Sequence, residues 1–214
     1  MMAASRPAAG GGRWVEVAPE RLEKWLAGFT ERHAVTAVES PDYGLRARTD
    51  DGTVAEFHVP FPPLAGDDLP ALVDHARRER HVGVLLVRLN GFAAGVFAGN
   101  RLIESKVDSR LVHGRAAAGG WSQKRFARRR EGQARAAYDA AAAVAQRILA
   151  GADLDAIVTG GDRRAVDAVL ADDRLTGLCP LVVEPFLTTP DPKRAVLEAT
   201  PAQFRATRIR IIDP

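Results

Sequence analysis

The chain has 214 residues, of which 46% are hydrophobic and 27% are charged, enough apolar content for a substantial core. No apolar run approaches the ~20 residues that cross a bilayer, and residues 1–13 lack the apolar stretch of a secretory signal. The single cysteine, Cys179, excludes a disulfide framework and a cysteine-based metal site, so we expect a cytoplasmic protein.

The first part of the chain predicts a small α+β unit over residues 13–60, after a disordered tail over residues 1–12. The expected elements are a strand at 14–17, a helix at 19–32, and strands at 34–39, 44–49 and 54–59. Asp50-Asp51-Gly52 is typical of a hairpin turn between the last two strands. Prolines at 60, 62 and 63 then predict a stiff boundary.

The remaining residues, 64–214, predict a second unit. The expected elements are a helix at 69–80, strands at 81–89, 92–98 and 101–111, a long helix at 122–150, a strand at 157–158, a helix at 163–170, a strand at 181–187, a short helix at 191–199 and a strand at 208–212. Strands first, followed by alternating helices and strands, predict an α/β (α+β) class with a mixed β-sheet flanked by helices. We expect an RNase H-like layout.

Positive charge is concentrated in one stretch of the sequence. The net charge is only +3, but residues 113–135 contain seven basic residues and the single acid Glu131, a net +6, which leaves −3 for the rest of the chain. Such a concentration favours a polyanion as partner, and nucleic acid is the commonest. An ordinary solvated helix face is the alternative interpretation.

The segment before the long helix contains residues suited to positioning a reaction. Gly119 and Gly120 give the backbone access to positive φ, Ser122 can cap the helix, and Gln123 then lies at the tip of the loop. A glutamine amide does not titrate, but it can orient a water molecule and donate a hydrogen bond to a developing oxyanion. The helix N-terminus adds partial positive charge at the same end.

The long helix combines an apolar stripe, which we expect to face the sheet, with a cationic ridge that can contact phosphates. The candidate RNA-binding residues in and before this helix are Arg115, Trp121, Lys124, Arg125, Arg128, Arg129, Arg130 and Arg135. Trp121 could stack on a nucleotide or anchor the base of the loop in the core, and both interpretations remain open. We expect His113 to be a structural hinge and not a catalyst.

These residues resemble the catalytic domain of eukaryotic and archaeal class I release factors. There, a strand leads into His-Gly-Arg-Gly-Gly-Gln-Ser and an Arg-Phe-Ala-Arg-type helix. The corresponding residues here are His113-Gly114-Arg115, Gly119-Gly120, Gln123 and Arg125-Phe126-Ala127-Arg128. In this chain Trp121 and Ser122 separate the glycines from the glutamine, and residues 116–118 lengthen the loop. That spacing resembles the Vms-like release factor family, in which a Gly-x-x-Gln arrangement serves ribosome rescue. The short actinobacterial-type peptidyl-tRNA hydrolases of that family are the most similar.

The resemblance implies a ribosome-associated peptidyl-tRNA hydrolase of translation quality control, with Gln123, Gly119 and Gly120 as catalytic residues. Its partners would be the large ribosomal subunit, rRNA and peptidyl-tRNA. The chain lacks room for a codon-reading or GTPase-docking domain, which implies rescue of stalled nascent chains and not stop-codon termination. We expect a monomer with no cofactor, no DNA partner and no membrane contact. Two alternatives are an endonuclease that cuts tRNA near its acceptor end and a non-catalytic module that binds the ribosome or another RNA.

No metal site is predicted, because the acidic residues of the second unit are scattered and the histidines outside the loop show no ligand spacing. Thr159-Gly160-Gly161-Asp162 lacks the lysine and the spacing of a Walker phosphate loop. We interpret it as a strand-to-helix turn that Asp162 caps. The N-terminal unit could bind a ribosomal protein, RNA or another partner, and none of its motifs separates these.

Overall fold

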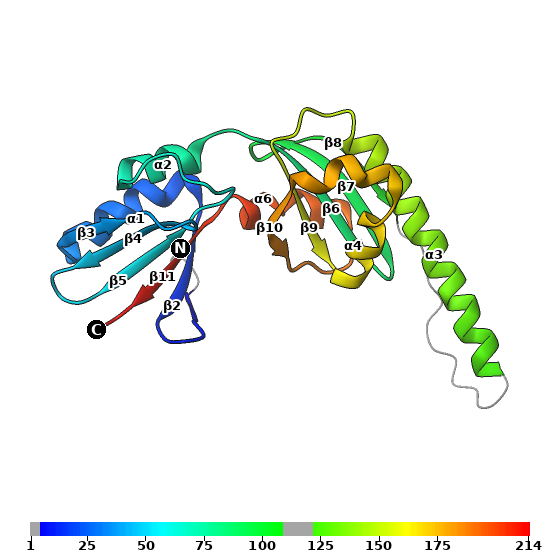
Figure 1. Ribbon diagram of the computed structural model, residues 1–214, viewed down its shortest axis with the longest axis horizontal. Helices are drawn as coiled ribbons and strands as arrows, with labels where there is room; N and C mark the ends of the chain where they lie inside the picture. The colour runs from blue at the N-terminus through cyan, green and yellow to red at the C-terminus, as the bar shows by residue number, and fades with distance from the viewer. Residues whose placement is uncertain (1–4, 109–121) are drawn as a thin grey trace. The chain divides into compact units, whose positions relative to one another are not determined.

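The chain folds around two separate β-sheets, one of six strands and one of five, in the computed structural model (Figure 1). The structure describes residues 5–108 and 122–214, and the side chains of residues 6–108 and 132–214. One unit consists of Met1–Glu79 together with Pro201–Pro214, and the other of Arg80–Thr200.

The first unit is an antiparallel sheet with two helices on one face. Its strands, in spatial order, are β1 (Ser5–Pro7), β2 (Arg13–Val17), β11 (Thr207–Ile212), β5 (Val54–His58), β4 (Gly44–Thr49) and β3 (Val35–Glu39). The helices are α1 (Pro19–Arg32), α2 (Leu69–Arg77) and the short α6 (Pro201–Phe204). Phe29 of α1 and Leu72 of α2 are buried in one cluster with Leu45 and Phe57 of the sheet, which places both helices on the same face.

The structure corrects two expectations about this unit. Residues 5–12 are not a disordered tail, because β1 pairs with β2 and the Arg210 guanidinium donates hydrogen bonds to the carbonyl oxygens of Ala9, Gly10 and Gly11. The last strand does not belong to a unit spanning 64–214, since β11 lies between β2 and β5 and pairs with both. The first unit therefore extends beyond the expected residues 13–60. It includes β11 and also α2, which precedes residue 80.

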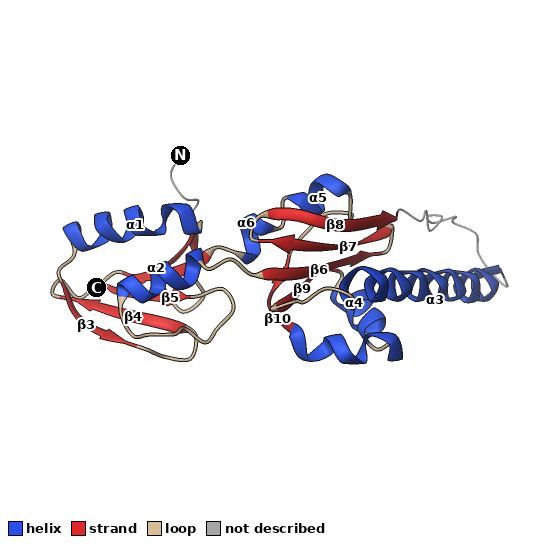
Figure 2. Ribbon diagram, turned by 90° about the horizontal axis from the view of Figure 1, so that it is seen from above, coloured by secondary structure: helices blue, strands red, loops and turns tan. Residues whose placement is uncertain are grey.

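The second unit is a mixed sheet flanked by helices, as predicted (Figure 2). Its strands, in spatial order, are β10 (Val182–Leu187), β9 (Ala156–Gly161), β6 (His81–Arg88), β7 (Gly91–Ala98) and β8 (Arg101–Asp108). β6, β7 and β8 form the expected antiparallel meander, and β9 and β10 are parallel to β6. The helices are α3 (Ser122–Leu149), α4 (Arg163–Leu170), the 3₁₀ segment η1 (Asp173–Leu181) and α5 (Arg194–Glu198).

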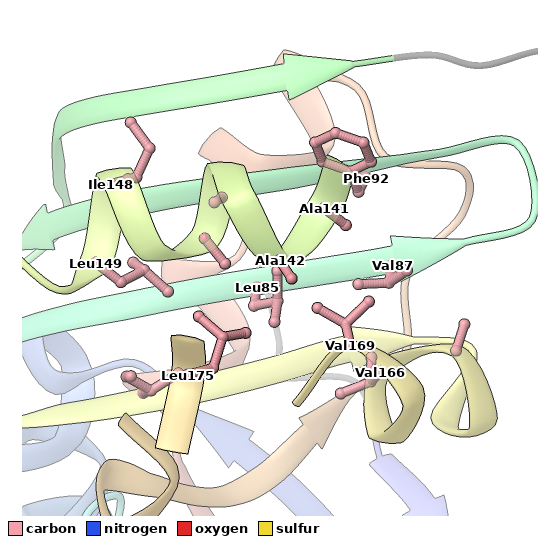
Figure 3. Packing of buried hydrophobic residues seen from close by; sticks show 14 of the residues in the cluster. Leu85, Val87, Phe92, Ala141, Ala142, Ile148, Leu149, Val166, Val169 and Leu175 are labelled. Carbon is pink, nitrogen blue, oxygen red and sulfur yellow. The ribbon is translucent and has the colours of Figure 1, made fainter. Parts of the chain in front are cut away.

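The core of the second unit joins α3, α4 and η1 to one face of this sheet (Figure 3). Ala141, Ala142 and Ala145 of α3 are fully buried in the same cluster as Phe92 of β7 and Leu85 of β6. The small alanine side chains let the helix backbone approach the sheet closely. Burial of each large apolar side chain in this cluster contributes about 1.5–3 kcal/mol.

The turn from β9 into α4 confirms the expected strand-to-helix turn. Gly161 has φ +103°, and a Cβ there would lie 2.3 Å from the carbonyl oxygen of Val87. The Asp162 side chain accepts a hydrogen bond from the Ala165 N–H at 3.0 Å and so caps α4. Glycine is therefore required at this turn by both its backbone conformation and the close approach of β6.

We expect Gly161→Ala to lower the free energy of unfolding by about 2 kcal/mol or more, since alanine would combine a strained φ with a backbone clash. Gly151→Ala is the matched control, because no atom lies within 4 Å of a Cβ at Gly151. Its effect should stay below about 0.5 kcal/mol. Urea denaturation followed by circular dichroism measures both values, and equal losses would contradict this explanation.

Candidate functional site

The candidate site lies at the N-terminal end of α3, which the structure begins at Ser122 as the sequence predicts. The helix has 28 residues and is therefore about 42 Å long. Among the residues of α3 whose side chains are described, 132–149, the buried ones lie between Ala141 and Leu149, and residues 132–137 contain none. Figures 1 and 2 show the N-terminal turns of α3 extending past the edge of the unit's own sheet. One half of the helix anchors it, and the other half carries the candidate residues outward.

The structure places most of the predicted site residues on this helix. The predicted site residues in its first turns are Gln123, Lys124, Arg125, Arg128, Arg129 and Arg130. Arg135 follows on the same helix, and its side chain is exposed. At 3.6 residues per turn, Arg125, Arg128 and Arg135 fall within about 80° of one another around the helix axis. The predicted residues Arg115, Gly119, Gly120 and Trp121 lie outside the described residues, as does His113.

An ion-pair network joins α3 to η1 where the helix enters the core. The Arg174 guanidinium donates hydrogen bonds to Asp139 of α3 at 2.6 Å and to Asp172 at 2.7 Å. These hydrogen bonds from Arg174 lower the pKa of Asp172 to about 2, and the two carboxylates raise the pKa of Arg174. Asp139 is next to Tyr138, which packs against the core cluster. The network therefore holds α3 at the point along the chain where its contacts with the core begin.

Sequence reasoning missed this network. Asp172 and Arg174 are two positions apart, and a close pair of this kind is visible in the sequence. The third member, Asp139, is 35 positions from Arg174 on another helix, and no local pattern connects them.

The acidic residues that we considered as metal ligands have structural partners or lie apart. Asp155 accepts a hydrogen bond from the His81 N–H at 2.7 Å, and Asp162 caps α4. Among the described residues, no three His, Cys, Asp or Glu side chains lie together in a way that could hold a metal ion. Within the same part of the chain, no helix is long and apolar enough to cross a membrane.

Comparison with known proteins gives a family match over the second unit and the following residues up to β11. The family of the actinobacteria/chloroflexi VLRF1 release factor matches residues 80–210. No curated protein matches the chain in sequence.

Several solved structures are similar at low sequence identity. The archaeal translation termination factor aRF1 is 11% identical with a TM-score of 0.40, over 88% of this chain and 73% of that protein. Dom34 of S. cerevisiae, a translation termination-like factor, is 8% identical with a TM-score of 0.34, over 96% and 70%. Pelota of Archaeoglobus fulgidus is 14% identical with a TM-score of 0.33, over 92% and 64%.

We expect Asp172→Asn to weaken the dependence of the free energy of unfolding on pH at acidic pH. The folded pKa of Asp172 is about 2, below its ordinary value of 3.8. Its contribution is therefore fully present above about pH 4 and is lost as the pH falls towards 2. The free energy of unfolding, measured in urea at a series of acidic pH values, should fall less steeply for Asp172→Asn than for the wild type.

Asp173→Asn is the control for this measurement, because Asp173 is exposed and has no ion-pair partner within the described parts of the chain. It should keep the wild-type slope. If the free energy of unfolding became less dependent on pH by the same amount in both variants, the Arg174 network would not be the cause of this dependence.

Proposed function

Because the chain belongs to the actinobacteria/chloroflexi VLRF1 release factor family, we propose that it is a ribosome-associated peptidyl-tRNA hydrolase. It would release stalled nascent chains from tRNA on the large ribosomal subunit. One observation supports the proposal: a single helix is anchored in the core at its C-terminal half and carries Gln123 and a run of basic residues at its N-terminal end. A helix anchored in this way can reach a reaction centre that lies outside the molecule.

The proposed reaction is hydrolysis of the ester between the nascent chain and the tRNA ribose. Water attacks the ester carbonyl carbon, the bond to the ribose oxygen breaks, and the ribose hydroxyl leaves with a proton. Gln123 orients the water and donates an amide N–H to the developing oxyanion. Since a primary amide does not titrate near neutral pH, Gln123 supplies positioning and electrostatic stabilisation, and the surrounding RNA completes the site.

The basic residues of α3 would supply affinity for RNA. Lys124, Arg125, Arg128, Arg129 and Arg130 occupy the turns nearest Gln123, and the positive end of the helix dipole points the same way. Contacts from these side chains to phosphates would be sensitive to salt and independent of sequence. Arg115, Gly119, Gly120 and Trp121 precede the helix in the sequence, and we propose that they complete the site.

Single-turnover release from isolated large subunits loaded with peptidyl-tRNA tests the catalytic role. Gln123→Ala should slow peptide release by about 100-fold or more, since loss of one oxyanion donor typically costs this much. Gln146→Ala removes an exposed glutamine near the other end of the same helix and should release at the wild-type rate. If Gln123→Ala released peptide at the wild-type rate, Gln123 would not be a catalytic residue. A shortened tRNA product would make the protein a nuclease instead.

Arg135→Gln tests the proposed RNA contacts of α3. Its affinity for large subunits should fall, and the slope of log affinity against log salt should become less steep by about 0.7–0.9, the effect of one lost phosphate contact. Arg147→Gln is the matched control, because Arg147 is an exposed arginine in the last turn of α3. Sedimentation binding at several salt concentrations measures both slopes. Identical slopes for the two variants would place Arg135 outside the interface.

A further inference from the structure

Among the described residues of the first unit, α1 and α2 both pack on one face of the six-stranded sheet and leave its second face uncovered by them. Side chains alternate between the two faces along a strand, so the residues between the core positions share this second face. Across the strands, Trp14 lies opposite Arg210, Arg210 opposite Glu56, and Glu56 opposite Arg46. In the neighbouring row, Arg208 lies opposite His58. The second face therefore displays arginine and aromatic side chains in adjacent rows.

Three aromatic rings meet on this face where β5 ends and β4 begins. The rings of Tyr43 and His58 stack with centroids 4.2 Å apart and an interplanar angle of 10°, and Trp14 meets His58 edge-on at 5.0 Å. The Arg208 guanidinium lies 4.7 Å from the Trp14 ring. All three residues are partly exposed, although the Tyr43 hydroxyl and the His58 Nε2 atom are buried. Burial holds the pKa of His58 below its ordinary value of 6.5, so its ring is mostly neutral at pH 7.

Positive charge in the first unit is concentrated on this face. Five arginines and three glutamates lie there, a net charge of +2, whereas the remainder of the unit sums to −4. These residues are Arg6, Arg46, Arg48, Arg208 and Arg210 with Glu16, Glu39 and Glu56. Arg208 is exposed and forms no ion pair with any carboxylate of the described chain, so its charge is available to a ligand.

We propose that this sheet face binds single-stranded RNA, with bases stacking on the cluster of Trp14, His58 and Tyr43 and Arg208 contacting a phosphate. Unpaired bases stack on aromatic side chains in single-strand binders, and a duplex keeps its bases stacked on one another. The charge distribution favours a polyanion on this face and disfavours it on the acidic remainder of the unit. The inference goes beyond peptide release and does not depend on it.

Fluorescence anisotropy with a labelled single-stranded oligoribonucleotide of about ten nucleotides tests the proposal. The parent protein is the full chain with the basic residues of the proposed α3 interface, Lys124, Arg125, Arg128, Arg129, Arg130 and Arg135, replaced by Gln, so that α3 contributes little to binding. In that background, Trp14→Leu should weaken binding at least about fivefold, since one base loses its stacking partner. Arg208→Gln should make the salt slope less steep by about 0.7. A hairpin duplex of the same length should bind more weakly than the single strand.

Arg77→Gln is the matched control, because it removes one exposed, ion-paired arginine from α2 on the opposite side of the unit. It should bind like the parent. Circular dichroism checks that each variant is folded, and Arg208→Gln, with its exposed side chain, decides the question if Trp14→Leu unfolds.

Unchanged RNA binding by Arg208→Gln and by folded Trp14→Leu would overturn the proposal and favour a protein ligand for this face. Equal affinity for hairpin and single strand would also overturn it. The assay contains no peptidyl-tRNA, so its result is independent of the release assay.

Discussion

The packing of α3 against its sheet is the contact on which the proposed site depends. Ala141, Ala142 and Ala145 are fully buried, and Ile148 and Leu149 add apolar area in the same cluster. Most helices in proteins are stable because tertiary contacts hold an apolar face. Residues 132–137 contain no fully buried side chain, so this part of α3 depends on the residues from Ala141 onward for its direction. The hydrogen bonds of Arg174 to Asp139 and Asp172 support the helix where its buried part begins.

The two units differ in how they present positive charge. On α3 the basic residues follow one another along a projecting helix and have a glutamine at its end. On the first unit the arginines lie across neighbouring strands of a sheet, and most form ion pairs with glutamates. The first arrangement is suited to reaching into a confined RNA site, and the second to supporting an extended strand. Together they would give one chain two separate contacts with RNA.

Local signals in the sequence predicted local structure well. The cap at Asp162, the meander from β6 to β8 and the start of α3 at Ser122 were confirmed, because each depends on residues that are close in sequence. The partner strands of β11 and the link from Asp139 to Arg174 could not be predicted, since both join distant segments. Glycines before β2 were misread as disorder, although their positive φ values build a turn that Arg210 holds. The catalytic assignment of Gln123 stays a prediction.

The central position of β11 has a consequence for biosynthesis. This strand follows the whole second unit in sequence, and it separates β2 from β5, which precede that unit. Until β11 emerges, both neighbours present unpaired edges, and Ile209 and Ile211 are missing from the core of the first unit. The second unit lies wholly between these segments in sequence and can fold earlier. The first unit is therefore complete only after the second unit and β11 have been synthesised, so a copy truncated before β11 would lack this inner strand.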